Sequence, residues 1–126
     1  MRRSIWGIAI LVALLISGIA IASGMHNVHD RISGLLEQAA AAAEQKDWQQ
    51  AEELTRQAED RWQRYHHFTA AFADHTPMDE LDGLFAELMV FLNNRESPHF
   101  EATCARLSLL ARAMADGHGL QWWNLL

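Results

Sequence analysis

Two hydrophobic patterns divide the 126-residue chain. From Ile5 to Ala22 the residues are uncharged and almost continuously apolar. Beyond Gly24 the apolar residues recur at steps of three and four, which is the spacing of amphipathic helices. No stretch alternates apolar and polar residues as a half-buried strand would. The pattern therefore predicts an all-α protein.

The apolar run follows Arg2 and Arg3, and a helix over it would rise about 27 Å, close to the thickness of the hydrocarbon core. This predicts a single N-terminal transmembrane helix with its N-terminus in the cytoplasm. A cleaved signal peptide is the alternative, because Ala20-Ile21-Ala22 fits a small-x-small cleavage site. We expect residues 1–24 to be a membrane anchor or signal peptide and residues 25–126 to form an extracytoplasmic helical domain. The anchored form would be a single-pass protein of the cell membrane.

Four amphipathic helices are predicted in the second part. They cover about residues 28–45, a segment starting at Asp47 as N-cap, and two segments that begin with Thr76-Pro77 and Ser97-Pro98. The stretch "DRISGLLEQ" is echoed by "DELDGLFAE" further along the chain. The echo suggests two stacked helical hairpins, and a small four-helix bundle fits the same pattern.

Charge and cysteine content exclude several classes of function. The net charge is −6, and Arg2 and Arg3 are two of only 10 basic residues, so the rest of the chain is more acidic still. An acidic chain does not suit the phosphates of nucleic acid. Cys104 is the only cysteine, which excludes an intramolecular disulfide, and it lies on an apolar stripe as a core residue would. No cofactor is expected.

The stretch from His66 to Leu84 is the first candidate site. His75, Asp79 and Asp82 could converge on a metal ion if the chain folds back at this point, and His66 or His67 could join them from the preceding helix. No recognised ligand spacing such as His-Glu-x-x-His is present. A helix junction capped by Thr76 explains most of the charge, because acidic residues stabilise the first turn of a helix. We favour the junction and keep an extracytoplasmic metal-binding protein as the alternative function.

Two further segments attract attention. His26 and His29 in "HNVHD" would share one face of a helix, and we interpret them as a polar collar beside the apolar run rather than a weak metal site. The C-terminal "LQWWNLL" carries no charge, and its candidate interaction residues are Trp122, Trp123 and Leu125. We expect this tail to pack along a groove that holds Trp62 and Phe72. A partner protein or a membrane interface is the alternative.

The chain resembles a family of small membrane-anchored bacterial helical proteins of unknown function (domain-of-unknown-function family 4363). The residues that carry the resemblance run from a "KDW..A" start of a helix to a Trp-Asn-Leu-Leu ending: Asp47, Trp48, Ala51, Trp62, Phe72, His75, Asp79 and Asn124. The resemblance implies an anchor and an all-helical extracytoplasmic domain, and it implies no activity.

The sequence offers no pattern of catalytic residues. It contains neither a glycine-rich phosphate loop nor a Gly-x-Ser-x-Gly motif. We therefore expect a non-enzymatic, membrane-tethered module that binds or scaffolds another protein. The expected partners are the lipid bilayer, through the N-terminal helix, and an unidentified protein.

Overall fold

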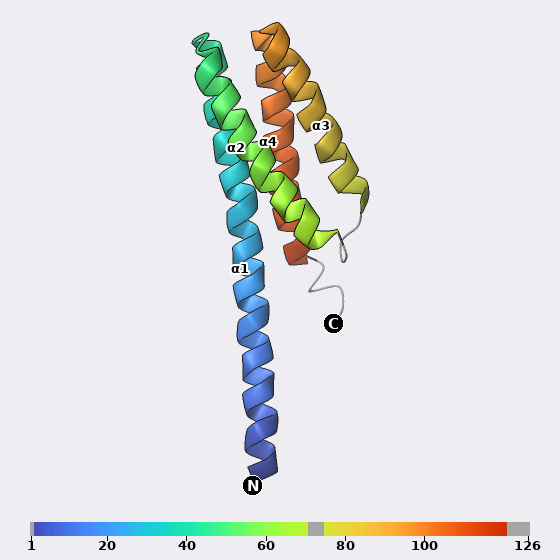
Figure 1. Cartoon of the computed structure of the whole chain (residues 1–126). Helices are drawn as coiled ribbons and strands as arrows, with labels where there is room; N and C mark the ends of the chain where they lie inside the picture. Colours follow the sequence, from blue (N-terminus) through green and yellow to red (C-terminus); the bar gives the residue numbers. More distant parts are fainter. Residues whose placement is uncertain (1, 71–74, 121–126) are drawn as a thin grey trace.

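The structure, a computed structural model, describes residues 2–70 and 75–120, and the side chains of all of these except 2–4, 22, 25–26, 75 and 117–120. The described residues form the helices α1 (Arg2–Glu44), α2 (Trp48–Thr69), α3 (His75–Asn94) and α4 (Ser97–Leu120) (Figure 1). No strand occurs in these ranges. The prediction of an all-α protein is confirmed.

The helices form an up-down-up-down bundle in which each helix packs against the next and α4 returns to α1 (Figure 1). The contacts of α1 with α2 and with α4 are extensive, whereas α2 and α3 share the smallest interface. In Figure 1, α3 diverges from α4 toward its N-terminal end. The bundle therefore has one loosely packed seam, between α2 and α3.

The core lies between the inward stripes of the four helices. Its largest fully buried apolar side chains come from all of them: Ile32, Leu36, Trp62, Met78, Leu81, Phe85, Leu88, Phe100 and Leu107. Alanines fill the places where the helices approach closely, as Ala39, Ala43, Ala51 and Ala58 are fully buried. These positions repeat at three and four residues, so the core is the one that the sequence pattern predicts.

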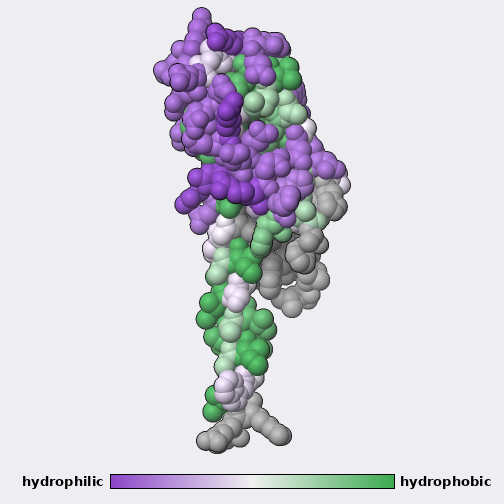
Figure 2. Space-filling view, in the orientation of Figure 1, coloured by the Kyte–Doolittle hydropathy of each residue, from purple (hydrophilic) through white to green (hydrophobic). Residues whose placement is uncertain are grey.

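The first part of α1 corrects the predicted fold. Residues 5–21, which we call the arm, extend beyond the bundle as an exposed apolar helix (Figure 2). Among the residues whose side chains are described, no helix is long and apolar enough to cross a membrane. The predicted transmembrane helix is therefore wrong; α1 instead continues through Gly24 into the bundle without a break.

The helix starts are partly as predicted. Asp47 is the N-cap of α2, and its carboxylate accepts a hydrogen bond from the backbone amide of Gln50 at 3.2 Å. In contrast, α3 begins at His75, so Thr76 lies inside its first turn. Ser97 is the first residue of α4, and its hydroxyl donates to the carbonyl of Ala43 at 3.1 Å, which ties α4 to the end of α1.

The sequence echo corresponds to a structural repeat. The turns that follow α1 and α3 both use a non-glycine residue with a left-handed backbone, Lys46 (φ 60°) and Arg95 (φ 55°). An equivalent backbone hydrogen bond closes each turn. The N–H of Asp47 donates to the carbonyl of Ala42 at 2.9 Å, and the N–H of Glu96 donates to the carbonyl of Phe91 at 3.0 Å. Two hairpins of the same design, α1–α2 and α3–α4, therefore pair to make the bundle.

Candidate functional site

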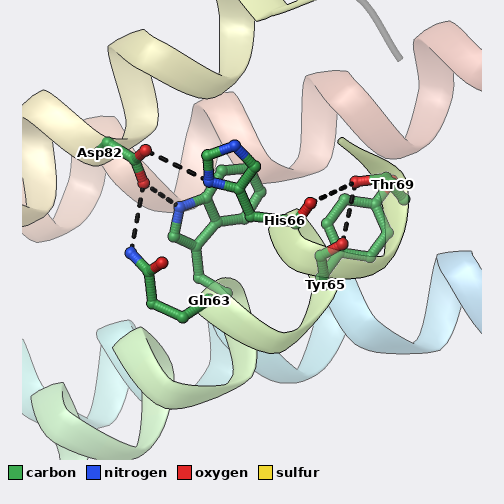
Figure 3. A network of polar contacts seen from close by, with 6 residues as sticks. Gln63, Tyr65, His66, Thr69 and Asp82 are labelled. Carbon is green, nitrogen blue, oxygen red and sulfur yellow. Dashed lines mark hydrogen bonds and ion pairs between the residues drawn. The ribbon is translucent and has the colours of Figure 1, made fainter. Parts of the chain in front are cut away.

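Asp82 is the centre of a polar cluster that links α3 to α2 (Figure 3). Its Oδ1 accepts a hydrogen bond from the indole Nε1 of Trp62 at 2.6 Å and a longer one from Nε2 of Gln63 at 3.4 Å. Its Oδ2 lies 3.2 Å from Nδ1 of His66. We call Trp62, Gln63, His66 and Asp82 the Asp82 cluster. It is the main polar link that the described residues make across the α2–α3 seam.

The local sequence explains why the cluster forms at this seam. Trp62 and His66 are four residues apart on α2, so they lie on one face of the helix, with ring centroids 5.7 Å apart. Trp62 is only 1% exposed, and a buried indole N–H requires an acceptor. Asp82 supplies that acceptor from the facing turn of α3. The carboxylate of Asp82 thus accepts the hydrogen bond of the buried indole N–H of Trp62, the largest buried side chain of the core.

The cluster does not have the composition of a hydrolytic site. It contains a carboxylate and an imidazole, but the hydroxyl drawn nearby in Figure 3, that of Thr69, donates to the carbonyl of Tyr65 at 2.9 Å. Cys104 lies on α4, where burial, reinforced by the charge of Glu101, raises the pKa of its thiol to about 12. A thiol with this pKa stays protonated at neutral pH and is a poor nucleophile. The geometry suits a structural clamp.

The predicted metal ligands do not come together among the described side chains. His66 contacts Asp82 instead of Asp79, and Asp79 is exposed on the surface of α3. The side chain of His75 lies outside the described residues. Within the part of the chain that the structure describes, no group of three or more His, Cys, Asp or Glu side chains could hold a metal ion.

The second histidine motif differs from the predicted polar collar. His29 is fully buried, and its ring meets that of Tyr65 edge to face, with centroids 4.7 Å apart. Asp30 is exposed, and the side chain of His26 is outside the described residues. His29 therefore belongs to the core at the base of the bundle, where it packs between α1 and α2.

The predicted interaction residues Trp122, Trp123 and Leu125 lie outside the described residues, as does Phe72 of the groove predicted to hold the tail. Sequence reasoning missed the bond from Trp62 to Asp82; it interpreted Asp82 as one of the acids that stabilise the start of α3 or as a possible metal ligand. One signal could have revealed it, namely a tryptophan on an inward stripe whose N–H needs a partner from a neighbouring helix.

Comparison with known proteins places the chain in a family. Residues 19–125 match the family described as "Domain of unknown function (DUF4363)", so the protein belongs to it. No curated protein and no solved structure matches the chain.

Proposed function

We propose that the protein is a non-enzymatic helical module that binds a partner protein through its apolar arm. The observation that carries this proposal is the exposure of the arm on every side: eleven large apolar side chains between Ile5 and Ile21 are uncovered, for example Leu14 at 68%. A helix that is apolar all round is normally enclosed by other elements. The arm is also continuous with the bundle, because α1 runs from the arm into the bundle as one unbroken helix.

The shape and charge of the arm favour a partner protein that offers apolar helices. Gly7 and Gly18 have open space where a side chain would be, so another helix can approach closely at these two positions. A second copy of the chain suits the arm less well, because two parallel arms would place two acidic bundles side by side. A partner surface that surrounds the arm on more than one side would leave the bundle free.

Photo-crosslinking from two matched positions tests the proposal. A benzophenone side chain replaces Leu14 on the arm or, as control, Leu109, which is 73% exposed on α4. We expect Leu14, and not Leu109, to give one discrete heteromeric adduct. Its protein component, once purified, should form a complex of fixed stoichiometry with the full chain, and Leu14→Arg should abolish this complex. Adducts with a second copy alone, with lipid alone, or equally from both positions would overturn the proposal.

A further inference from the structure

Three arginines surround the root of the arm, where α1 enters the bundle. Arg61 and Arg64 lie on α2 and border a hollow that reaches Gly24 of α1. Arg31 lies on α1, three residues after Val28 of the same hollow, and therefore on the same side of that helix. We call Arg31, Arg61 and Arg64 the arginine collar. Figure 2 shows the hydrophilic surface of the bundle ending directly above the apolar arm.

The charged ends of the collar point into solvent. The surface of the hollow is almost entirely apolar, so the hydrocarbon stems of Arg61 and Arg64 line it while their guanidinium groups turn outward. Arg31 and Arg64 are exposed, and Arg61 is half-buried. The collar therefore presents positive charge beside the root of the arm.

The collar has no carboxylate partner among the described side chains, since none of its three arginines takes part in an ion pair there. Farther back on α2, Arg56 pairs with a glutamate four residues before it. The corresponding position before Arg61 is Gln57, which carries no charge. Arg64 donates through Nε to the backbone carbonyl of Asp60 at 3.3 Å, which leaves its other N–H groups available.

The fold leaves the charges of the collar uncompensated. Arg61 and Arg64 are three residues apart on one face of α2, where like charges repel each other. The helix dipole favours His66 and His67 in the last turn, but its effect falls off within that turn. Arg61 and Arg64 lie before it. An anion supplied from outside the bundle would offset this repulsion.

The base of the bundle carries both signs of charge, which restricts the kind of anion that can approach. α2 ends and α3 begins at this base (Figure 1). Asp79 and Glu80 are exposed at the start of α3, and Asp116 is exposed near the end of α4. A broad anionic surface, such as an acidic membrane, would meet these acids together with the collar and be repelled by them. A protein can place carboxylates opposite the collar alone.

We propose that the partner protein that surrounds the arm has an acidic rim, which contacts the arginine collar when the arm is bound. This inference rests on the partner-binding role proposed above for the arm, and it specifies the chemistry of that partner. Carboxylates of the rim accept hydrogen bonds from the planar guanidinium groups of Arg61 and Arg64, and Arg31 adds charge from α1. The arm buries apolar surface, while the collar fixes the orientation of the partner and speeds the encounter.

Zero-length crosslinking locates the acidic rim. Lys46 is the only lysine of the chain, and it lies in the turn after α1, at the opposite end of the bundle from the arm (Figure 1). The complex of the full chain with the partner identified through Leu14 is treated with a carbodiimide. In the variant Arg64→Lys, we expect an amide bond between residue 64 and an aspartate or glutamate of the partner, mapped by mass spectrometry. Arg106→Lys, at an exposed position on α4, is the matched control and should give no adduct with the partner.

Charge reversal measures how much the collar contributes to binding. Arg61→Glu with Arg64→Glu should weaken the same complex at least about tenfold at low salt, and the loss should shrink as salt is added. Arg61→Gln with Arg64→Gln should weaken it severalfold, and Arg106→Glu should change it little. Circular dichroism of each variant checks that the helices are retained.

The outcomes separate this inference from the role of the arm. A complex that Leu14→Arg abolishes, but that both double arginine variants leave unchanged, would overturn the acidic rim and keep the arm's role. Equal adducts from Arg64→Lys and Arg106→Lys would also overturn the rim. If the full chain binds phosphatidylglycerol vesicles and the double glutamate variant does not, the collar binds phosphate head groups instead. If Leu14 yields no partner protein, both proposals are wrong.

Discussion

The hydrogen bond from Trp62 to Asp82 should be among the largest single polar contributions to the stability of the bundle. The indole is buried and the bond is short, 2.6 Å, to a carboxylate. Removing the acceptor with Asp82→Ala leaves a buried N–H unsatisfied, which costs about 1–3 kcal/mol. The contact of Asp82 with the partly buried His66 and its long contact with the exposed Gln63 add less, because pairs near the surface contribute about 0–1 kcal/mol. We expect a total loss of about 2 kcal/mol.

A double-mutant cycle isolates this bond from other effects of the substitutions. Asp82→Asn keeps an oxygen acceptor and should cost about 1 kcal/mol less than Asp82→Ala. Trp62→Phe removes the donor, so combining it with Asp82→Ala should show a coupling of about 1–2 kcal/mol. His66→Ala should show much weaker coupling to Asp82.

The assay is thermal and urea unfolding of the full chain, followed by circular dichroism in a non-ionic detergent that covers the arm. For a domain of this size, a loss of about 2 kcal/mol lowers the melting temperature by roughly 10 °C. A cost below about 0.5 kcal/mol for Asp82→Ala, or additivity with Trp62→Phe, would show that water replaces the carboxylate and that the reasoning is wrong.

Four further predictions concern the core and the turns. Cys104 should react with a thiol reagent only after unfolding, whereas Leu109→Cys in a Cys104→Ala background should react at once, and equal rates would refute burial. Its thiol pKa is raised from 9.0 to about 12, so the folded protein holds a proton that the unfolded chain loses between these pH values. Stability in urea should therefore fall as pH rises through that window, and Cys104→Ala should reduce the fall. Ala58→Leu, at a fully buried position, should lower the unfolding free energy by about 1–3 kcal/mol through overpacking. Lys46→Gly and Arg95→Gly should each raise the unfolding free energy by about 0.5–1 kcal/mol, because glycine adopts a left-handed backbone without strain. The unfolding assay described above measures the effects of the Ala58 and turn substitutions.

The helices and the core could be predicted because they depend on local periodicity. The inward stripe of α2 from Ala51 to Thr69 is buried as its spacing indicates, and Asp47 caps the helix. The start of α3 was less accurate. His75 already has helical backbone, although the Thr76-Pro77 signal makes Pro77 the first helical residue, two residues later.

The site could not be predicted in the same way because it depends on the register between two helices. Nothing in the spacing of His66, Asp79 and Asp82 decides which carboxylate faces the imidazole. That choice follows from the rotation of α3 that buries Met78, Leu81 and Phe85, which leaves Asp79 in solvent. The same limit applies to His29, whose polar neighbours suggest a surface position while its place on the stripe of Ile32 and Leu36 buries it.

The repeated hairpins make the unequal seams of the bundle informative. Ser33 on α1 occupies the place that Asp82 occupies on α3, at the same offset in sequence as Lys46 and Arg95. Ser33 and Ser108 exchange hydrogen bonds through hydroxyl and carbonyl groups at 3.2 and 3.4 Å, and these short side chains let α1 and α4 approach closely.

Asp82 reaches Trp62 and His66 through long side chains, so α2 and α3 meet at a smaller interface. The two hairpins share their turns and most of their buried positions, so this difference contributes to the contrast between a closely packed seam and one with a small interface. Local opening requires least loss of apolar contact where the interface is smallest. The α2–α3 seam, clamped by Asp82, is therefore where the bundle can open while α1 keeps the arm fixed to α2 and α4.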